Sequence, residues 1–183
     1  MVEFTVHDDN SAPDEAKPAL ALAKKQFGFV PNLYGVLAES PQAFAAYQAV
    51  SDQFLRSSLP SAAKQVVWLT ASRQNGCTYC VAAHSVIAKT AGVDASVVEA
   101  IREDKPIDNA ALEAVRRFTV QVVDSRGWVP DDDVQAFLDQ GFTRRHVLDI
   151  LTGVAQKTLS NYTNHLAHTP LDDVFGSSAW TAD

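Results

Sequence analysis

Closely spaced helix-ending and helix-starting residues divide the chain into segments of helical period, and this pattern most constrains the fold. Ser40-Pro41 is a helix start, with serine as the N-cap and proline at the first helical position. Gly28 and Gly92 follow apolar segments, where glycine commonly forms a left-handed C-terminal cap. Between such signals apolar residues recur at three- and four-residue steps, which makes one face of each segment apolar. In the segment that begins at residue 41, these residues are Phe44, Tyr47, Val50 and Phe54.

The same reading along the whole chain predicts an all-α protein with about eight helices. The Val-rich piece Val120–Val123 lies inside a segment of helical period and shows no alternation, so we assign it to a helix. Helices are expected at the following positions: up to about residue 26, 33–38, from 41, 61–74, 77–91, 94–101, from 108, 131–138 and 143–168. We expect one helical domain over residues 14–175, between an N-terminal arm (1–13) and a C-terminal arm (176–183).

Charge and hydropathy exclude two classes of partner. The net charge is −7 and basic residues occur at most in adjacent pairs, so a nucleic-acid backbone would be repelled. No apolar run approaches the roughly 20 residues that span a bilayer. The N-terminus carries Glu3, Asp8 and Asp9 and lacks the cationic start and apolar stretch of a signal peptide. We therefore expect a cytoplasmic protein with no nucleic-acid or membrane partner.

The two cysteines of the chain form a Cys-x-x-Cys pair with a histidine in phase. Cys77 and Cys80 are three residues apart, and His84 follows Cys80 by four. On a helix both separations place side chains on one face, and the seven residues from Cys77 to His84 make about two turns. All three side chains are therefore expected along one narrow stripe.

This stripe suits dithiol redox chemistry. The attacking species is a thiolate, and a helix N-terminus lowers the pKa of a cysteine there. Gly76 is expected to end one helix, so that Cys77 starts the next and Cys80 lies in its first turn. His84 is placed to take a proton from Cys80 directly or through one water. A sulfenic acid on one cysteine can then condense with the other thiol to give a disulfide.

Other interpretations of the same residues remain open. A structural disulfide between Cys77 and Cys80 is disfavoured by the very short loop and by a reducing compartment. A zinc site would use Cys77, Cys80 and His84 but needs a further ligand from His146, His165 or His168, all distant in sequence. His84 could also simply be a packed histidine.

Three segments of the chain resemble one known family. They are the stretch 72–84, which contains the Cys-x-x-Cys-x-x-x-His core, together with the flanking stretches 29–34 and 157–165. The sequence is similar to the alkyl hydroperoxidase D-like branch of the carboxymuconolactone decarboxylase family, in its peroxidase-related subgroup. The resemblance extends over about residues 28–175.

The resemblance implies a function and a role for each residue of the stripe. It implies an all-helical fold, a homo-oligomer (commonly a trimer or hexamer) and reduction of hydroperoxides by a dithiol. Cys80 would attack, Cys77 would resolve, and His84 would belong to the proton relay. The reductant would be a dithiol protein or a small dithiol, and no cofactor or metal is implied.

Two positions depart from the family pattern. Gln65 stands where the family relay has a glutamate, and Tyr79 stands where it has a second histidine. Glutamine cannot accept a proton at neutral pH, and the reference pKa of tyrosine is about 10. We therefore treat Gln65 and Tyr79 as possible relay or lining residues.

The sequence thus predicts a thiol-dependent peroxidase or disulfide oxidoreductase. The alternatives are a carboxymuconolactone decarboxylase-like enzyme, which needs no dithiol, and a zinc-binding or redox-sensing interaction protein. Asn161, Asn164 and His165 share a helix face that either lines the active site or a subunit interface, or is solvated. Trp180 is expected to dock on a neighbouring subunit.

Overall fold

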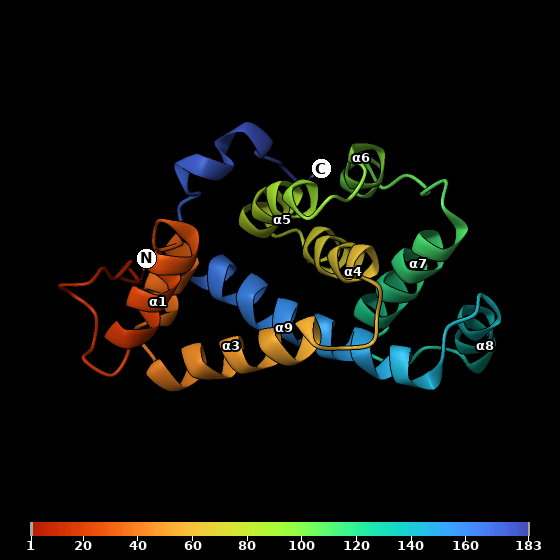
Figure 1. The fold of residues 1–183 in the computed structure, drawn as a ribbon, viewed down its shortest axis with the longest axis horizontal. Coiled ribbons are helices and arrows are strands. Elements are labelled where there is room, and N and C mark those ends of the chain that lie inside the picture. The colour runs from red at the N-terminus through yellow and green to blue at the C-terminus, as the bar shows by residue number, and fades with distance from the viewer. Residues whose placement is uncertain (1, 183) are drawn as a thin grey trace.

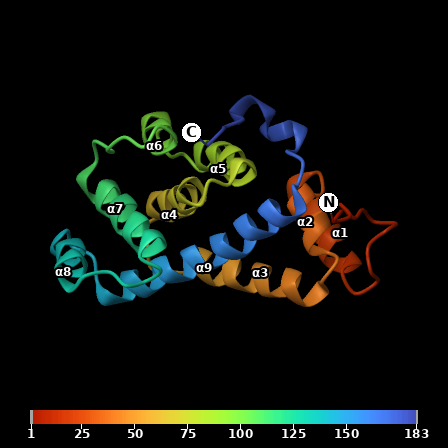
Figure 2. The same cartoon turned by 180° about the vertical axis from the view of Figure 1, so that it is seen from behind.

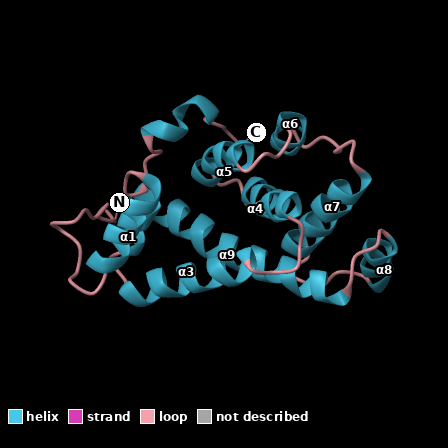
Figure 3. Cartoon of the chain, viewed as in Figure 1, coloured by secondary structure: helices cyan, strands magenta, loops and turns pink. Residues whose placement is uncertain are grey.

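The structure, a computed structural model, describes residues 2–182, and all regular structure within them is helical (Figures 1 and 3). This confirms the all-α prediction. The elements are α1 (Lys17–Phe27), α2 (Asn32–Leu37), α3 (Pro41–Leu55), α4 (Ser61–Gln74), α5 (Thr78–Thr90), α6 (Ala95–Arg102), α7 (Ala110–Asp124), α8 (Asp131–Asp139), α9 (Arg144–Ala167) and the 3-10 helix η1 (Asp173–Ser178).

Caps place most helix ends close to the predicted positions. Ser40 caps α3 by accepting from the backbone N–H of Ala43, and Thr143 caps α9 in a capping box with His146. The start of α7 differs by two residues from the expected position. There Asn109, and not Asp108, accepts from the backbone N–H of Leu112.

Helix α4 lies at the centre of the molecule and packs against α5, α7 and α9. Helix α3 runs beside α9, as the two opposite views show (Figures 1 and 2). Gly153 permits the close approach of α9 to its neighbours, because a Cβ there would lie 2.7 Å from the ring of Phe54 and 2.8 Å from Val67. The longest helix is therefore held tightly against the centre of the fold.

The apolar interior forms two clusters. One is built mainly on α4, α6 and α7 and includes Val67, Leu69 and Phe118. The other joins α1, α2 and α3 to the start of α5 and to Phe175 of η1, and it contains both cysteines. The dithiol is therefore buried among apolar side chains from both ends of the chain.

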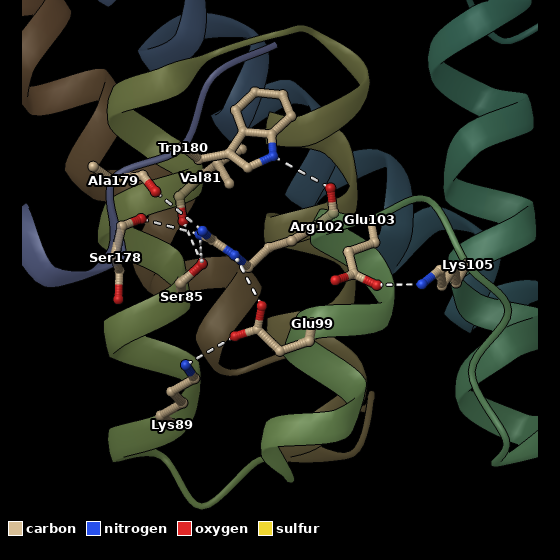
Figure 4. Close-up of polar contacts among 10 residues, drawn as sticks. All are labelled: Val81, Ser85, Lys89, Glu99, Arg102, Glu103, Lys105, Ser178, Ala179 and Trp180. Carbon is tan, nitrogen blue, oxygen red and sulfur yellow. Dashed lines mark hydrogen bonds and ion pairs between the residues drawn. The ribbon is translucent and has the colours of Figure 1, made fainter. Parts of the chain in front are cut away.

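The segment after η1 returns across α5 and α6 and is held there by Arg102 (Figure 4). The Arg102 guanidinium donates to the carbonyls of Ser178 (3.0 Å) and Ala179 (3.1 Å) and to the Ser85 hydroxyl (2.9 Å). The indole N–H of Trp180 donates to the Arg102 carbonyl at 3.2 Å. The polar atom of Trp180 is therefore bonded within its own chain, and docking of its ring on a neighbouring subunit stays a prediction.

Neither predicted arm boundary separates an exposed arm from the helical domain. Ala12 and Ala16, on either side of the expected end of the N-terminal arm, are both buried. The expected start of the C-terminal arm at residue 176 falls inside η1. Met1 and Asp183, the outer ends of these arms, lie outside the described residues. None of the helices in residues 2–182 is both long and apolar enough to cross a bilayer.

Candidate active site

The turn between α4 and α5 places the two cysteines. Gly76 adopts the left-handed conformation (φ +67°) that ends α4, and the backbone N–H of Cys77 donates to the Ser72 carbonyl at 3.0 Å. Cys77 is then the N-cap residue of α5, and Cys80 lies in the first turn. The sequence prediction for this turn is confirmed.

Both thiols are free and buried, and side chains of α9 contact them. The amide nitrogen of Asn164 lies 3.2 Å from Cys80 Sγ and 3.8 Å from Cys77 Sγ. The Ser160 hydroxyl lies 3.9 Å from Cys80 Sγ. Asn164 thus contacts both sulfurs. Asn161 and Asn164, on the predicted polar face of α9, are buried at the dithiol site, whereas His165 is exposed.

Lys157 is a part of the site that the sequence analysis did not identify. Its side chain is 1% exposed, and its Nζ lies 2.7 Å from Nε2 of His84. Lysine is almost never fully buried without a partner. Here the partners are the His84 ring and the Cys80 sulfur. Burial lowers the pKa of Lys157, and the negative charge of the Cys80 sulfur opposes this lowering in part.

The two cysteines are driven to opposite protonation states. Burial by itself raises the pKa of Cys80, but the hydrogen bond from the Cys77 thiol and the positive charge of Lys157 outweigh it and lower that pKa to about 5. The same hydrogen bond, together with burial, raises the pKa of Cys77 far above its usual range. Cys80 is therefore the thiolate at neutral pH, and Cys77 is the thiol that donates to it.

His84 is neutral in this environment. Burial and the nearby charge of Lys157 lower the pKa of His84 well below its usual value. Its ring packs on Trp68 with the centroids 5.3 Å apart, and within residues 2–182 no hydrogen bond joins it to either sulfur. The direct Cys80–His84 contact expected from helical phase is replaced by contacts of both groups with Lys157.

Tyr79 and Gln65 occupy different environments from the one expected for a relay. The Tyr79 hydroxyl donates to the Asp172 carboxylate at 2.5 Å and accepts from the backbone N–H of Leu33 at 3.4 Å. Burial and the Asp172 carboxylate raise the pKa of Tyr79 far above its usual value. Gln65 is buried in α4, and within residues 2–182 its Oε1 has no hydrogen-bond partner and no hydrogen bond joins it to the dithiol. Tyr79 connects α5 to the C-terminal segment, and a role of Tyr79 or Gln65 in the proton relay stays a prediction.

The zinc interpretation lacks a ligand set in this arrangement. Across residues 2–182, no group of three or more His, Cys, Asp or Glu side chains gathers in a way that could hold a metal ion. His84, the expected third ligand, is instead in contact with the Lys157 amine.

An apolar cavity of about 450 Å³ opens beside the attacking group. Cys80, His84 and Lys157 line it together, and they bring the thiolate and the ammonium to one place. The rest of the lining is mainly aromatic and aliphatic and comes from both ends of the chain: Phe27, Phe29, Leu33, Tyr34, Tyr47 and Phe175. This arrangement suits a ligand with an apolar body whose reactive atom meets Cys80.

Comparison with known proteins places this site in a family. The family described as "Carboxymuconolactone decarboxylase family" matches residues 39–119, which include α4, α5 and the dithiol. An uncharacterised peroxidase-related protein from Ralstonia eutropha JMP134, described as an alkylhydroperoxidase AhpD core, superposes with a TM-score of 0.85 at 25% identity. That match covers 94% of this chain and 93% of the other. Residues 39–119 thus match the carboxymuconolactone decarboxylase family, and the chain has the fold of an alkylhydroperoxidase AhpD core.

Two more distant members of the same fold are informative. A peroxidase-related protein from Silicibacter sp. TM1040 has a TM-score of 0.79 at 19% identity, covering 95% of both chains. The debrominase Bmp8, as a variant in complex with 2,3,4-tribromopyrrole, has a TM-score of 0.81 at 19% identity, covering 97% of this chain and 96% of the other. No curated protein sequence matches the chain. The fold is thus shared by a peroxidase-related protein and a debrominase, so the fold alone does not determine the reaction.

Proposed function

We propose that this protein is a thiol-dependent peroxidase that reduces organic hydroperoxides through Cys80 and Cys77. The observation that carries the proposal is the lowered pKa of Cys80, about 5, next to the buried Lys157 in an apolar cavity. A thiolate at neutral pH is the nucleophile that the reaction requires, and a cationic group beside it can protonate the leaving oxygen.

In the first step the Cys80 thiolate attacks the terminal oxygen of the hydroperoxide. The O–O bond breaks, Cys80 becomes a sulfenic acid, and the alkoxide takes a proton from the Lys157 ammonium to leave as an alcohol. Lys157 is left as an amine hydrogen-bonded to His84, which lies 2.7 Å away. Protonation in this step therefore comes from Lys157, with His84 as the residue that positions it.

In the second step Cys77 resolves the sulfenic acid. The Lys157 amine takes the Cys77 thiol proton, the Cys77 sulfur bonds to Cys80 Sγ as the S–O bond of the sulfenic acid breaks, and the leaving hydroxide takes that proton from Lys157 to form water. The hydrogen bond between the two cysteines places them for this reaction. One hydroperoxide and two thiols thus give one alcohol, one water and one disulfide.

The cavity favours substrates with an apolar body. Hydrogen peroxide would leave most of the 450 Å³ unfilled, whereas an alkyl or aryl hydroperoxide would bury its carbon skeleton against Phe29, Tyr34 and Phe175. We therefore expect a higher kcat/KM for cumene hydroperoxide than for hydrogen peroxide.

The test is consumption of cumene hydroperoxide with a dithiol reductant. We expect turnover by the unaltered protein, none by Cys80→Ser, and a single unproductive oxidation by Cys77→Ser. Unchanged turnover in Cys80→Ser would refute the proposal. Turnover of a lactone acid substrate by the Cys77→Ser/Cys80→Ser double variant would support the decarboxylase alternative instead.

A second candidate function is reductive dehalogenation of an aromatic compound. The aromatic lining of the cavity fits a planar ring, and the debrominase Bmp8, which has the same fold, binds 2,3,4-tribromopyrrole in its crystal structure. In this reaction the dithiol would supply two electrons, a C–Br bond would become C–H, bromide would leave, and the Cys77–Cys80 disulfide would form. Bromide release from 2,3,4-tribromopyrrole, without turnover of cumene hydroperoxide, would favour this function.

We also propose that the enzyme is a cytoplasmic homo-oligomer, a trimer or hexamer. Support comes from large exposed apolar residues on α9, which lie at successive steps of three, eleven and four residues and so share one helix face: Leu148, Leu151, Tyr162 and Leu166. An exposed apolar stripe of this kind is typical of an interaction surface. Analytical ultracentrifugation tests the proposal, and a monomer at micromolar concentration would contradict it.

A further inference from the structure

The two cysteines line different cavities. Cys80 lines the apolar cavity described above, whereas Cys77 lines a second pocket of about 400 Å³ between the start of α5 and the end of α9. Polar residues dominate this second pocket: Thr78, Asn164, His165, His168 and Thr169. Tyr79 is the only lining residue that both cavities share among the described residues. We call the second space the Cys77 pocket.

The Cys77 pocket also holds polar atoms that lack partners. Asn164 is 5% exposed, and its amide nitrogen is directed at the sulfurs, whereas its Oδ1 has no hydrogen-bond partner. The hydroxyl of Thr169 is likewise buried and unpaired. Buried polar atoms without partners are uncommon in folded proteins. A ligand that brings O–H, N–H or S–H donors into the Cys77 pocket would satisfy them.

We propose that the Cys77 pocket is the binding site of the thiol reductant, which attacks Cys77 from a different cavity than the one that admits the hydroperoxide. This inference rests on the proposed peroxidase function, because it concerns the disulfide that peroxide reduction leaves behind. It assigns to the second cavity a ligand class, a thiol with hydrogen-bond donors, and it assigns the attacked sulfur.

The chemistry of exchange agrees with this geometry. The reductant thiolate bonds to Cys77 Sγ, the Cys77–Cys80 bond breaks, and Cys80 leaves as a thiolate. A second reductant thiol then displaces the Cys77 thiolate, which is protonated, and the reductant leaves as a disulfide. Exchange is faster when the leaving thiol has the lower pKa. Here the leaving group is Cys80, which Lys157 and Asn164 stabilise as an anion.

Separate access has a kinetic consequence. An alcohol product that remains in the apolar cavity does not block the Cys77 pocket. We therefore expect cumyl alcohol to compete with cumene hydroperoxide but not with the reductant.

The first test locates the attacked sulfur in the unaltered protein. The disulfide is formed with diamide, which requires no peroxidase activity, and is then treated briefly with glutathione, quenched with acid and alkylated. Peptide mass analysis is expected to find glutathione on Cys77 and the alkyl group on Cys80. Glutathione on Cys80 would overturn the proposal.

The second test separates the two half-reactions with bulky substitutions. His165→Trp narrows the Cys77 pocket and is expected to slow reduction of the disulfide by dithiothreitol about tenfold or more, with oxidation by cumene hydroperoxide unchanged within about twofold. Ile87→Trp, in the apolar cavity, is expected to slow oxidation by cumene hydroperoxide and to leave reduction of the disulfide by dithiothreitol unchanged. Leu22→Trp, on an exposed part of α1 that lines neither cavity, is the matched control. Equal slowing of both half-reactions by His165→Trp would overturn the proposal.

These tests distinguish the inference from the proposed function. If cumene hydroperoxide oxidises nothing but the diamide-formed disulfide is still attacked at Cys77, the peroxidase proposal fails and the assignment of the pocket holds. If cumene hydroperoxide oxidises the dithiol but glutathione attaches to Cys80, the peroxidase proposal holds and the assignment of the Cys77 pocket fails. The glutathione experiment needs no variant, so a misfolded His165→Trp does not affect it.

Discussion

Replacing Lys157 by methionine should raise the pKa of Cys80 by about three units. Methionine keeps the unbranched apolar stem and removes the charge that stabilises the thiolate. Two unit charges about 4 Å apart interact by about 4 kcal/mol at the effective dielectric constant of ~20 that describes protein sites. Since one pKa unit corresponds to about 1.4 kcal/mol, this is about three units.

The expected change has a definite pH signature. In the unaltered protein the pKa of Cys80 is about 5, so the thiolate dominates at pH 7 and is lost only as the pH falls through 5. In Lys157→Met a pKa of about 8 would leave roughly a tenth of the molecules as thiolate at pH 7. Iodoacetamide alkylation of Cys80 as a function of pH measures both values.

The control removes a charge of the same sign from the surface. Lys25 is exposed and forms no ion pair among the described residues, so Lys25→Met should leave the pKa of Cys80 unchanged. A pKa for Cys80 in Lys157→Met that stays within half a unit of 5 would show that Lys157 does not stabilise the thiolate. The lowering of the Cys80 pKa would then come from hydrogen bonds with Cys77, Asn161 and Ser160 alone.

Three further changes test other parts of the structure. Tyr79→Phe should cost about 1–3 kcal/mol of unfolding free energy, because Asp172 loses a buried hydrogen bond, yet it should leave the pH profile of Cys80 alkylation unchanged; a shifted profile would restore Tyr79 to the relay. Gly153→Ala should cost about 1–3 kcal/mol in urea unfolding, since its Cβ would lie 2.7 Å from a buried ring, whereas Gly176→Ala, in open space, should be nearly neutral. Arg102→Met should speed amide hydrogen exchange in the last ten described residues, and unchanged protection would mean that the arginine does not hold this segment.

Local signals account for the parts of the fold and site that the sequence predicts. The Asn75-Gly76 turn and the spacing of Cys77 and Cys80 are determined within one helix and its preceding turn, and the structure has them as expected. The all-α class follows in the same way from caps and from the apolar period of each segment.

Contacts between distant segments account for what the sequence could not predict. Lys157 meets His84 across 73 positions, and nothing near Lys157 in α9 distinguishes a buried lysine from a solvated one. The one available signal was its place on the same helix as Asn161 and Asn164, at steps of three and four. Tyr79 is similarly redirected by Asp172, which lies 93 positions away.

The most direct test of the central claim is to identify the cysteine that hydroperoxide oxidises first. Cys77→Ser is treated with one equivalent of cumene hydroperoxide in the presence of dimedone, which traps sulfenic acids, and the adduct is located by mass analysis. We expect a dimedone adduct on Cys80 and one equivalent of cumyl alcohol. In the control without hydroperoxide we expect no adduct. Absence of an adduct on Cys80 in the treated sample, with the hydroperoxide unconsumed, would contradict the proposed function.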